Sequence, residues 1–308
     1  MNASLPIVLS AFGFSGMACG AAGPFGADMT HDGDTGSQSR RDAGSIDAEL
    51  LRPDISGTLP GRLLGSRFVT DVSAETLRSV VLPGAVVENG YALYELDVLT
   101  SGRVARVTVT VPADIERPHA ILHAVGTTGV ADACGVVGTE WGAGLAGLYG
   151  ARGQVGMALD YPGLGTEGDH AYLVGRVSGQ AVLDALSAFT EFAEQRGIEW
   201  SGRSAVTGLS QGGHAALWAA RLHPQHAPEL DLRAVAVVGP ASVWLEHWQP
   251  GLTFEGDHLV YHALLVWAWS RHYRATGPSP WAEAIAPNID AWMTSLCAFP
   301  PPQAPEQT

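Results

Sequence analysis

The stretch AVTGLSQGGHAALW, residues 205–218, decides the fold. The apolar run RSAVTG leads into it and predicts a strand, whereas the residues that follow the turn carry apolar side chains at helical spacing. Between the two, GLSQG satisfies the pattern GxSxG, in which a serine occupies a strained turn from strand to helix. Side chains at Gly208 and Gly212 would collide as the chain reverses. The stretch therefore predicts a nucleophile elbow with Ser210 at its tip.

An elbow of this kind presents a serine hydroxyl together with a hydrogen-bond donor. The backbone N–H of Gln211 should point at the same space as the Ser210 hydroxyl, at a helix N-terminus whose dipole favours developing negative charge. His214 lies only four positions further on, but reaching back to the serine would be awkward for it. We therefore expect a structural role for His214, because the base in this architecture comes from a later loop.

The rest of the chain predicts alternating strands and helices. Short apolar or alternating runs that predict strands are YALYELDVLT (91–100), VARVTVTV (104–111), HAILHAVG (119–126), QVGMALD (154–160), SAVTG (204–208) and LRAVAVVG (232–239). Helical spacing is found in VSGQAVLDALSAFTEFAEQRG (177–197), which ends in a glycine stop, and in QGGHAALWAARLH (211–223). This alternation favours an α/β fold with a mostly parallel sheet.

Composition excludes some classes of function. The chain has 308 residues and is 46% hydrophobic, which allows a substantial core. Its 17 basic residues, all arginine, against 31 acidic ones give a net charge of −14. Such a protein repels phosphate backbones, so nucleic acid is not an expected partner. The three cysteines form no CxxC pair and no cluster with histidine, so the sequence gives no support for a zinc site.

Residues 1–22 are predicted to be a signal peptide, although they lack the positive n-region that is usual there. A misassigned start or a buried N-terminal segment are the alternatives. Cys19 is a candidate for lipid attachment, and cleavage nearby with release of the protein is the other interpretation. Gly-, Asp- and Ser-rich residues 23–57 predict a flexible leader. No later run is long enough for a transmembrane span.

After the core at 58–242, the pattern predicts a helical cap at 243–298 and a disordered tail at 299–308. Three segments in this region favour helices: SVWLEHW (242–248), DHLVYHALLVWAWSRHYRA (257–275) and PWAEAIAPNIDAWMTSLCA (280–298). Six of the nine tryptophans lie after residue 240, and LVYHALLVWAW is apolar almost all round. A lipidic or bulky acyl substrate and ordinary packing explain this composition equally well.

Three segments resemble the secretory lipase family of α/β-hydrolases: GTTGVADAC (126–134), LDYPGLGTEGDHAYLVG (159–175) with SGQAVLDA, and the stretch 208–242 that contains the elbow. The resemblance implies an α/β-hydrolase core with flanking helices and a helical cap. It also implies that Thr128 lies beside the nucleophile and forms the oxyanion hole with the Gln211 N–H. Cys134 and Cys297 correspond to a pair that is bridged in secreted members, which implies a disulfide worth roughly 2 to 4 kcal/mol.

Two further kinds of position need interpretation. Asp160 follows a strand on the active-site side, where a catalytic role is open, but we favour a structural role in which it bonds backbone amides of its glycine turn. In this fold the triad acid and base follow the serine, in the order Ser, Asp/Glu, His. None of the later candidates follows a strand-like run, so we expect surface or cap packing for Asp257, Asp290, His247, His258, His262 and His272.

The triad acid and base therefore stay unidentified, and the simplest expectation is a chain that stops before the last strands of the sheet. The leading hypothesis is a secreted or envelope-associated carboxylic ester hydrolase that forms an acyl-serine on Ser210 and needs no metal or organic cofactor. The alternatives are a catalytically impaired remnant or apolar-ligand-binding module, and a serine peptidase or amide hydrolase on the same fold.

Overall fold

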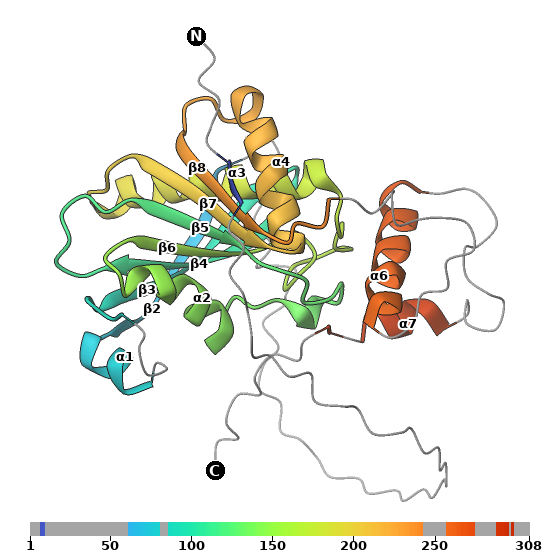
Figure 1. Ribbon diagram of the computed structural model, residues 1–308, viewed down its shortest axis with the longest axis horizontal. Coiled ribbons are helices and arrows are strands. Elements are labelled where there is room, and N and C mark those ends of the chain that lie inside the picture. Colours follow the sequence, from blue (N-terminus) through green and yellow to red (C-terminus); the bar gives the residue numbers. More distant parts are fainter. Residues whose placement is uncertain are drawn as a thin grey trace, which may run out of the picture.

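A computed structural model describes residues 7–9, 61–80, 86–242, 257–274, 288–295 and 297–298. An eight-stranded mixed sheet crosses its centre in the order β1-β8-β7-β5-β6-β4-β3-β2 (Figure 1). The strands are β1 (Ile7–Leu9), β2 (Leu63–Val72), β3 (Tyr91–Thr100), β4 (Arg103–Pro112), β5 (Ala120–Ala124), β6 (Val155–Asp160), β7 (Arg203–Leu209) and β8 (Asp231–Val238). The six predicted strands are all present, and β1 and β2 are additional.

The sheet divides into an antiparallel and a parallel half. Strands β2, β3, β4 and β6 pair antiparallel, whereas β6, β5, β7, β8 and β1 pair parallel. In the parallel half, Ala124 at the end of β5 lies opposite Gly208 near the end of β7. The carboxyl ends of β5, β6 and β7 therefore meet at one edge of the sheet, which is where ligands bind in open α/β sheets.

Helices cover both faces of this sheet (Figure 1). Met157 and Leu159 of β6 pack into the main core with α3 (Gly175–Arg196) and α4 (Gln211–His226). Ala158, between them, belongs instead to a cluster with Ala146 of α2 (Glu140–Gly150). Because successive strand residues point to opposite faces, α2 covers the face opposite to α3 and α4.

Local signals set the ends of these helices. Helix α3 is capped by Gly197, whose φ of +65° is the left-handed conformation that the predicted glycine stop requires. Helix α2 begins after Thr139, whose side chain accepts a hydrogen bond from the Gly142 amide. The sequence did not predict α2 or the short helix α1 (Ala74–Val80). None of the helices in the described part has the length and hydropathy that a membrane crossing requires.

Two further helices, α6 (Asp257–His272) and α7 (Ile289–Met293), pack beside the carboxyl edge of the sheet (Figure 1). Trp267 and Leu264 of α6 form a buried cluster with Val130, Tyr172 and other residues. The predicted helix at 257–275 is thus confirmed over most of its length, whereas α7 accounts for only a short part of the segment at 280–298.

Several predicted segments lie outside the described residues. The leader at 23–57 and the tail at 299–308 do so entirely, and the predicted helix at 242–248 does so except for its first residue. The predicted signal peptide is described only where it forms strand β1. These predictions therefore stay predictions.

Candidate active site

Ser210 occupies the sharp turn between β7 and α4. Its backbone has φ +54° and ψ −116°, a conformation that non-glycine residues rarely adopt. A Cβ at Gly208 would lie 2.2 Å from the Gly212 carbonyl oxygen, and a Cβ at Gly212 would lie 1.8 Å from the Ala124 carbonyl oxygen. Neither position accepts a side chain, so the two glycines allow the turn to form against the end of β5.

The loop after β5 lies directly beside this turn. A Cβ at Gly126 would lie 3.3 Å from the Leu209 carbonyl oxygen. Two positions further along the same loop, Thr128 is buried, and its Oγ1 has no hydrogen-bond partner among the described residues. The loop that contains Thr128 and the elbow that contains Ser210 are therefore neighbours.

A disulfide ties this loop to the C-terminal part of the chain. Cys134 and Cys297 are bonded, as the resemblance implied. The connection is extended by backbone contacts, because Gly129 forms a bridge with Cys297 and the Ala298 amide donates to the Thr128 carbonyl at 2.7 Å. Both ends of the segment 128–134 are thus held by residues 297–298.

Asp160 ends β6 and is buried. Its carboxylate accepts hydrogen bonds from the amides of Val136 and Val137, at 2.9 Å and 2.7 Å. The prediction that Asp160 bonds backbone amides is confirmed, but the prediction that those amides belong to its own glycine turn is wrong. Burial raises the pKa of Asp160 to about 6, although the two amide bonds oppose that shift. Asp160 therefore braces the loop that follows Cys134.

Beneath the elbow, the Gln211 side chain is fully buried and bonded to a histidine that the sequence analysis did not single out. Gln211 Nε2 lies 2.8 Å from His170 Nε2. Burial lowers the pKa of His170 to about 4, so its imidazole is neutral at neutral pH. The only signal in the sequence was the position of His170 within the family-like segment at 159–175.

The described histidines and carboxylates form no hydrogen bond to Ser210 Oγ. Nε2 of His214 accepts from the Trp218 indole at 3.1 Å, and burial lowers its pKa to about 4. This contact agrees with the structural role expected for His214. Asp290 accepts from the Trp267 indole and pairs with Arg271, which is the cap packing predicted for it.

Other candidates for the triad acid and base are placed only in part. His272 packs edge-on against Tyr273 at the end of α6. His262 is buried in the same helix. Asp257 and His258 begin α6, but their side chains, like all of His247, lie outside the described residues. The described contacts thus assign neither an acid nor a base to Ser210.

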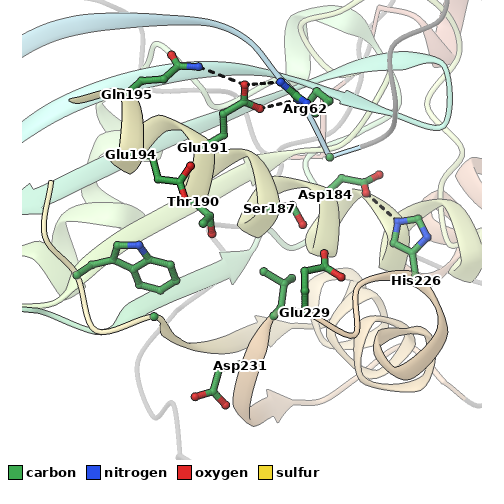
Figure 2. A pocket seen from close by; sticks show the side chains of 14 residues that line it. Arg62, Asp184, Ser187, Thr190, Glu191, Glu194, Gln195, His226, Glu229 and Asp231 are labelled. Atoms are coloured by element: carbon green, nitrogen blue, oxygen red, sulfur yellow. Dashed lines mark hydrogen bonds and ion pairs between the residues drawn. The ribbon is translucent and has the colours of Figure 1, made fainter. Parts of the chain in front are cut away.

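A cavity of about 800 Å³ contains an Asp–His pair but lies far from the elbow. Figure 2 shows the Asp184 carboxylate of α3 bonded to His226. Oδ1 of Asp184 lies 2.7 Å from Nε2 of His226. His226 is the last residue of α4, and Ser210 directly precedes the first. The full length of that 16-residue helix, roughly 24 Å, separates the two residues. This pair therefore cannot act on Ser210.

The chain is similar to known lipases and esterases. The family model described as "Secretory lipase" matches residues 148–245, about a third of the chain, and includes the elbow. Lipase 2 of Candida albicans is 44% identical over 69 residues, which are 22% of this chain and 15% of that protein. Lipase 1 of the same organism is 42% identical over 59 residues, 19% of this chain and 13% of that protein. The matched region is thus under a sixth of either relative.

Solved structures establish the fold. The rice cell wall degrading esterase LipA from Xanthomonas oryzae superimposes with a TM-score of 0.61 at 18% identity, covering 77% of this chain and 67% of LipA. Candida antarctica lipase A in its closed state gives 0.55 at 19% identity, covering 78% and 53%. The predicted resemblance to secretory lipases is confirmed, and the chain has the α/β-hydrolase fold.

Proposed function

We propose that the protein is a serine hydrolase that cleaves carboxylic esters through an acyl-serine intermediate on Ser210. The observation that carries this proposal is the backbone of Ser210, held at φ +54° between two glycine positions that exclude a Cβ. Strained conformations of this kind persist mainly at functional sites. The lipases and esterases to which the chain is similar support the ester class over other serine chemistries.

In the proposed reaction, Ser210 Oγ attacks the ester carbonyl carbon, and the carbonyl electron pair moves onto oxygen. The Gln211 N–H and Thr128 would stabilise that oxyanion. Collapse of the adduct breaks the C–O bond to the alcohol, which leaves with the proton of Ser210. Water then adds to the acyl group and breaks its bond to Oγ, so that the carboxylic acid departs and Ser210 recovers its proton.

This sequence of steps needs a general base to carry the serine proton. In the α/β-hydrolase fold the base follows the nucleophile along the chain, and the described contacts assign no histidine after Ser210 to this role. We propose no metal or organic cofactor, because acyl transfer on serine requires only a base and oxyanion donors.

The proposed substrates are small esters or lipids. Val130, in the same loop as Thr128, packs in a buried cluster with Trp267 and Leu264 of α6. The similarity of the chain to lipases and esterases supports this substrate class. The disulfide and the similarity to secretory lipases favour a secreted or envelope-associated protein, with Cys19 as the candidate for lipid attachment.

A second candidate function is an apolar-ligand-binding protein, or an impaired hydrolase, that uses the same site without turnover. The contacts of His170 and His214 favour this candidate. His170 is bonded to Gln211, and His214 is bonded to Trp218. Both imidazoles are thus engaged away from the serine hydroxyl. Removal of triad members typically leaves only a small part of the activity.

Labelling with a fluorophosphonate probe separates the two candidates. We expect the wild-type protein to be labelled and Ser210→Ala to lose all labelling. Ser204→Ala is the matched control, because Ser204 lies on the same strand and its hydroxyl bonds the Asp231 carbonyl at the far end. A folded wild-type protein that takes no label would refute the hydrolase. Rates on p-nitrophenyl butyrate, triglyceride emulsion and peptide amides then distinguish esterase, lipase and amidase.

A further inference from the structure

Three aromatic rings pack together in the segment that follows β6. Tyr161 and His170 are stacked, with their ring centroids 5.6 Å apart and their planes 25° apart, and Tyr172 meets His170 edge-on at 6.2 Å. Each of the three is only 1% exposed. None of them takes part in the acyl-transfer steps above, so their burial and their polar atoms need another explanation.

A glycine turn allows this stack to form. Gly163 has φ +88°, and a Cβ there would lie 2.5 Å from the His170 amide nitrogen. The chain can therefore fold back after Pro162 and bring His170 over Tyr161. The Pro162 carbonyl then lies 3.3 Å from His170 Nδ1.

The two tyrosines of the stack reach the loop after β5. Tyr161 donates to the Val125 carbonyl at 3.0 Å, and the Tyr172 hydroxyl lies 2.9 Å from Thr127 Oγ1. Thr127 directly precedes Thr128, the proposed oxyanion donor of this loop. The tyrosines thus hold the loop at two points on its way to that donor.

The histidine of the stack reaches the other proposed donor. His170 Nε2 contacts the side chain of Gln211, whose backbone N–H is the donor at the elbow. The Gln211 side chain is fully buried, so this contact is shielded from water. One cluster of rings therefore contacts both segments of the proposed oxyanion hole.

The hydrogen-bond partners fix the protonation of His170. The Pro162 carbonyl can only accept, so Nδ1 carries the proton and donates it. Nε2 is therefore an acceptor, and the Gln211 amide must turn its NH₂ group toward it. Because the imidazole is neutral, this donor and acceptor assignment holds at neutral pH.

We propose that His170 is a positioning residue of the oxyanion hole, which fixes Gln211 through its side chain. Tyr161 and Tyr172 fix the loop of Thr128 through their hydrogen bonds to Val125 and Thr127. The inference rests on the proposed function. The two donors come from loops after different strands, so their spacing depends on a shared support. A displacement of about 1 Å at a catalytic group lowers turnover by about 100-fold.

The test compares His170→Phe with His170→Gln in the full chain. Phenylalanine keeps the ring but removes the acceptor, so we expect kcat on p-nitrophenyl butyrate to fall about 100-fold with KM unchanged. Glutamine restores an acceptor, and we expect it to recover at least about tenfold of that loss. His223→Phe is the control, because His223 Nε2 bonds the Leu230 carbonyl near the opposite end of α4. We expect it to leave kcat unchanged.

Gln211→Met tests the same bond from its other partner and keeps the backbone N–H. We expect a similar fall in kcat, and we expect His170→Gln to add no further effect in the double variant, since the bond is already lost. Gln211→Met and its double variant with His170→Gln also test the positioning role if His170→Phe does not fold.

The outcomes separate this inference from the proposed function. A wild-type protein that takes no fluorophosphonate label refutes both. If the wild-type protein is labelled, and His170→Phe and Gln211→Met keep the wild-type kcat, only the positioning role is refuted. A rise in KM with kcat unchanged also refutes it, because that pattern indicates a role in substrate binding rather than in the transition state.

Discussion

Reduction of the Cys134–Cys297 disulfide should both destabilise the protein and slow its turnover. The cysteines are 163 residues apart. For a closed loop of that size the chain-entropy relation gives about 5 kcal/mol at about 25 °C. Losses on removing native disulfides are typically about 2 to 5 kcal/mol, so this value lies at the upper end. For a domain of this size it corresponds to a melting temperature lower by roughly 10 °C.

The effect on turnover follows from what the disulfide holds. Residues 297–298 pair with Thr128 and Gly129, so reduction frees one side of the loop that supplies the proposed oxyanion donor. We expect reduction to lower kcat about tenfold or more, even in assays at temperatures well below the melting temperature.

Calorimetry and ester hydrolysis with and without dithiothreitol measure both effects. The variant Cys134→Ser/Cys297→Ser should match the reduced wild-type protein and should not respond to reductant. Cys19→Ser should behave as the wild-type protein does, because it keeps the pair. Complete reduction in a thiol titration, together with a melting temperature within about 2 °C of the oxidised value, would contradict the stabilising role of the disulfide.

Three other predictions test the elbow, the loop brace and the buried histidines. Gly212→Ala should abolish folding or labelling, because its Cβ would lie 1.8 Å from the Ala124 carbonyl oxygen. Gly144→Ala is the control, because a Cβ there has no neighbour within 4 Å, and it should be neutral or slightly stabilising in urea unfolding. Asp160→Asn should lower the free energy of unfolding by about 2 kcal/mol, since an amide can accept only one of the two N–H bonds; an unchanged urea midpoint contradicts this. Burial lowers the pKa values of His170 and His214 to about 4 from 6.5, so the unfolded chain binds more protons between these values. Each histidine should therefore remove roughly 1.5 kcal/mol of stability as pH falls from about 6.5 to about 5. Asp160, whose pKa is raised to about 6, should offset part of this loss of stability below pH 6. Urea unfolding at about pH 6.5 and about pH 5 measures the loss, and His214→Gln should make it smaller.

The elbow could be predicted because its requirements are local. The pattern GLSQG needs a strand before it and a helix after it, and both are visible in a few residues on either side. The same is true of the end of α3, where Gly197 marks the C-cap. The parallel strands β5, β6, β7 and β8 are predictable because they are short runs rich in apolar residues.

Helix α2 could not be found in this way, because its sequence EWGAGLAGLYG has poor helix propensity. Gly147 and Gly150 of this helix allow close contacts with distant strands. A Cβ at Gly147 would lie 2.6 Å from the Tyr91 hydroxyl, and one at Gly150 would lie 2.7 Å from Thr110 Oγ1. Tertiary packing therefore selects residues that oppose the local preference, and only the assembled sheet reveals why.

The partners of Asp160 and His170 also depend on the assembled sheet. Asp160 bonds amides that lie 24 and 23 positions earlier in the chain, and His170 reaches Gln211 across 41 positions. The sequence indicated that both segments matter, through the family resemblance, but it gave no sign that one braces the loop after Cys134 and the other the residue after the nucleophile. Pairings between loops of different strands require the strand order.

The elbow with its proposed oxyanion donors is one part of the site, and the triad acid and base are the other. The Ser210 amide donates to the Val238 carbonyl at 3.0 Å, and the Ser210 carbonyl accepts from His214 and Ala241, so neighbouring elements hold the strained residue on both sides. A backbone strain of about 1 to 3 kcal/mol persists only with such support. Neither these contacts nor those of the proposed oxyanion donors involve a triad acid or base among the described residues. The elbow and the donors should consequently stay ordered in variants that abolish turnover, which is why fluorophosphonate labelling and substrate hydrolysis have to be measured separately.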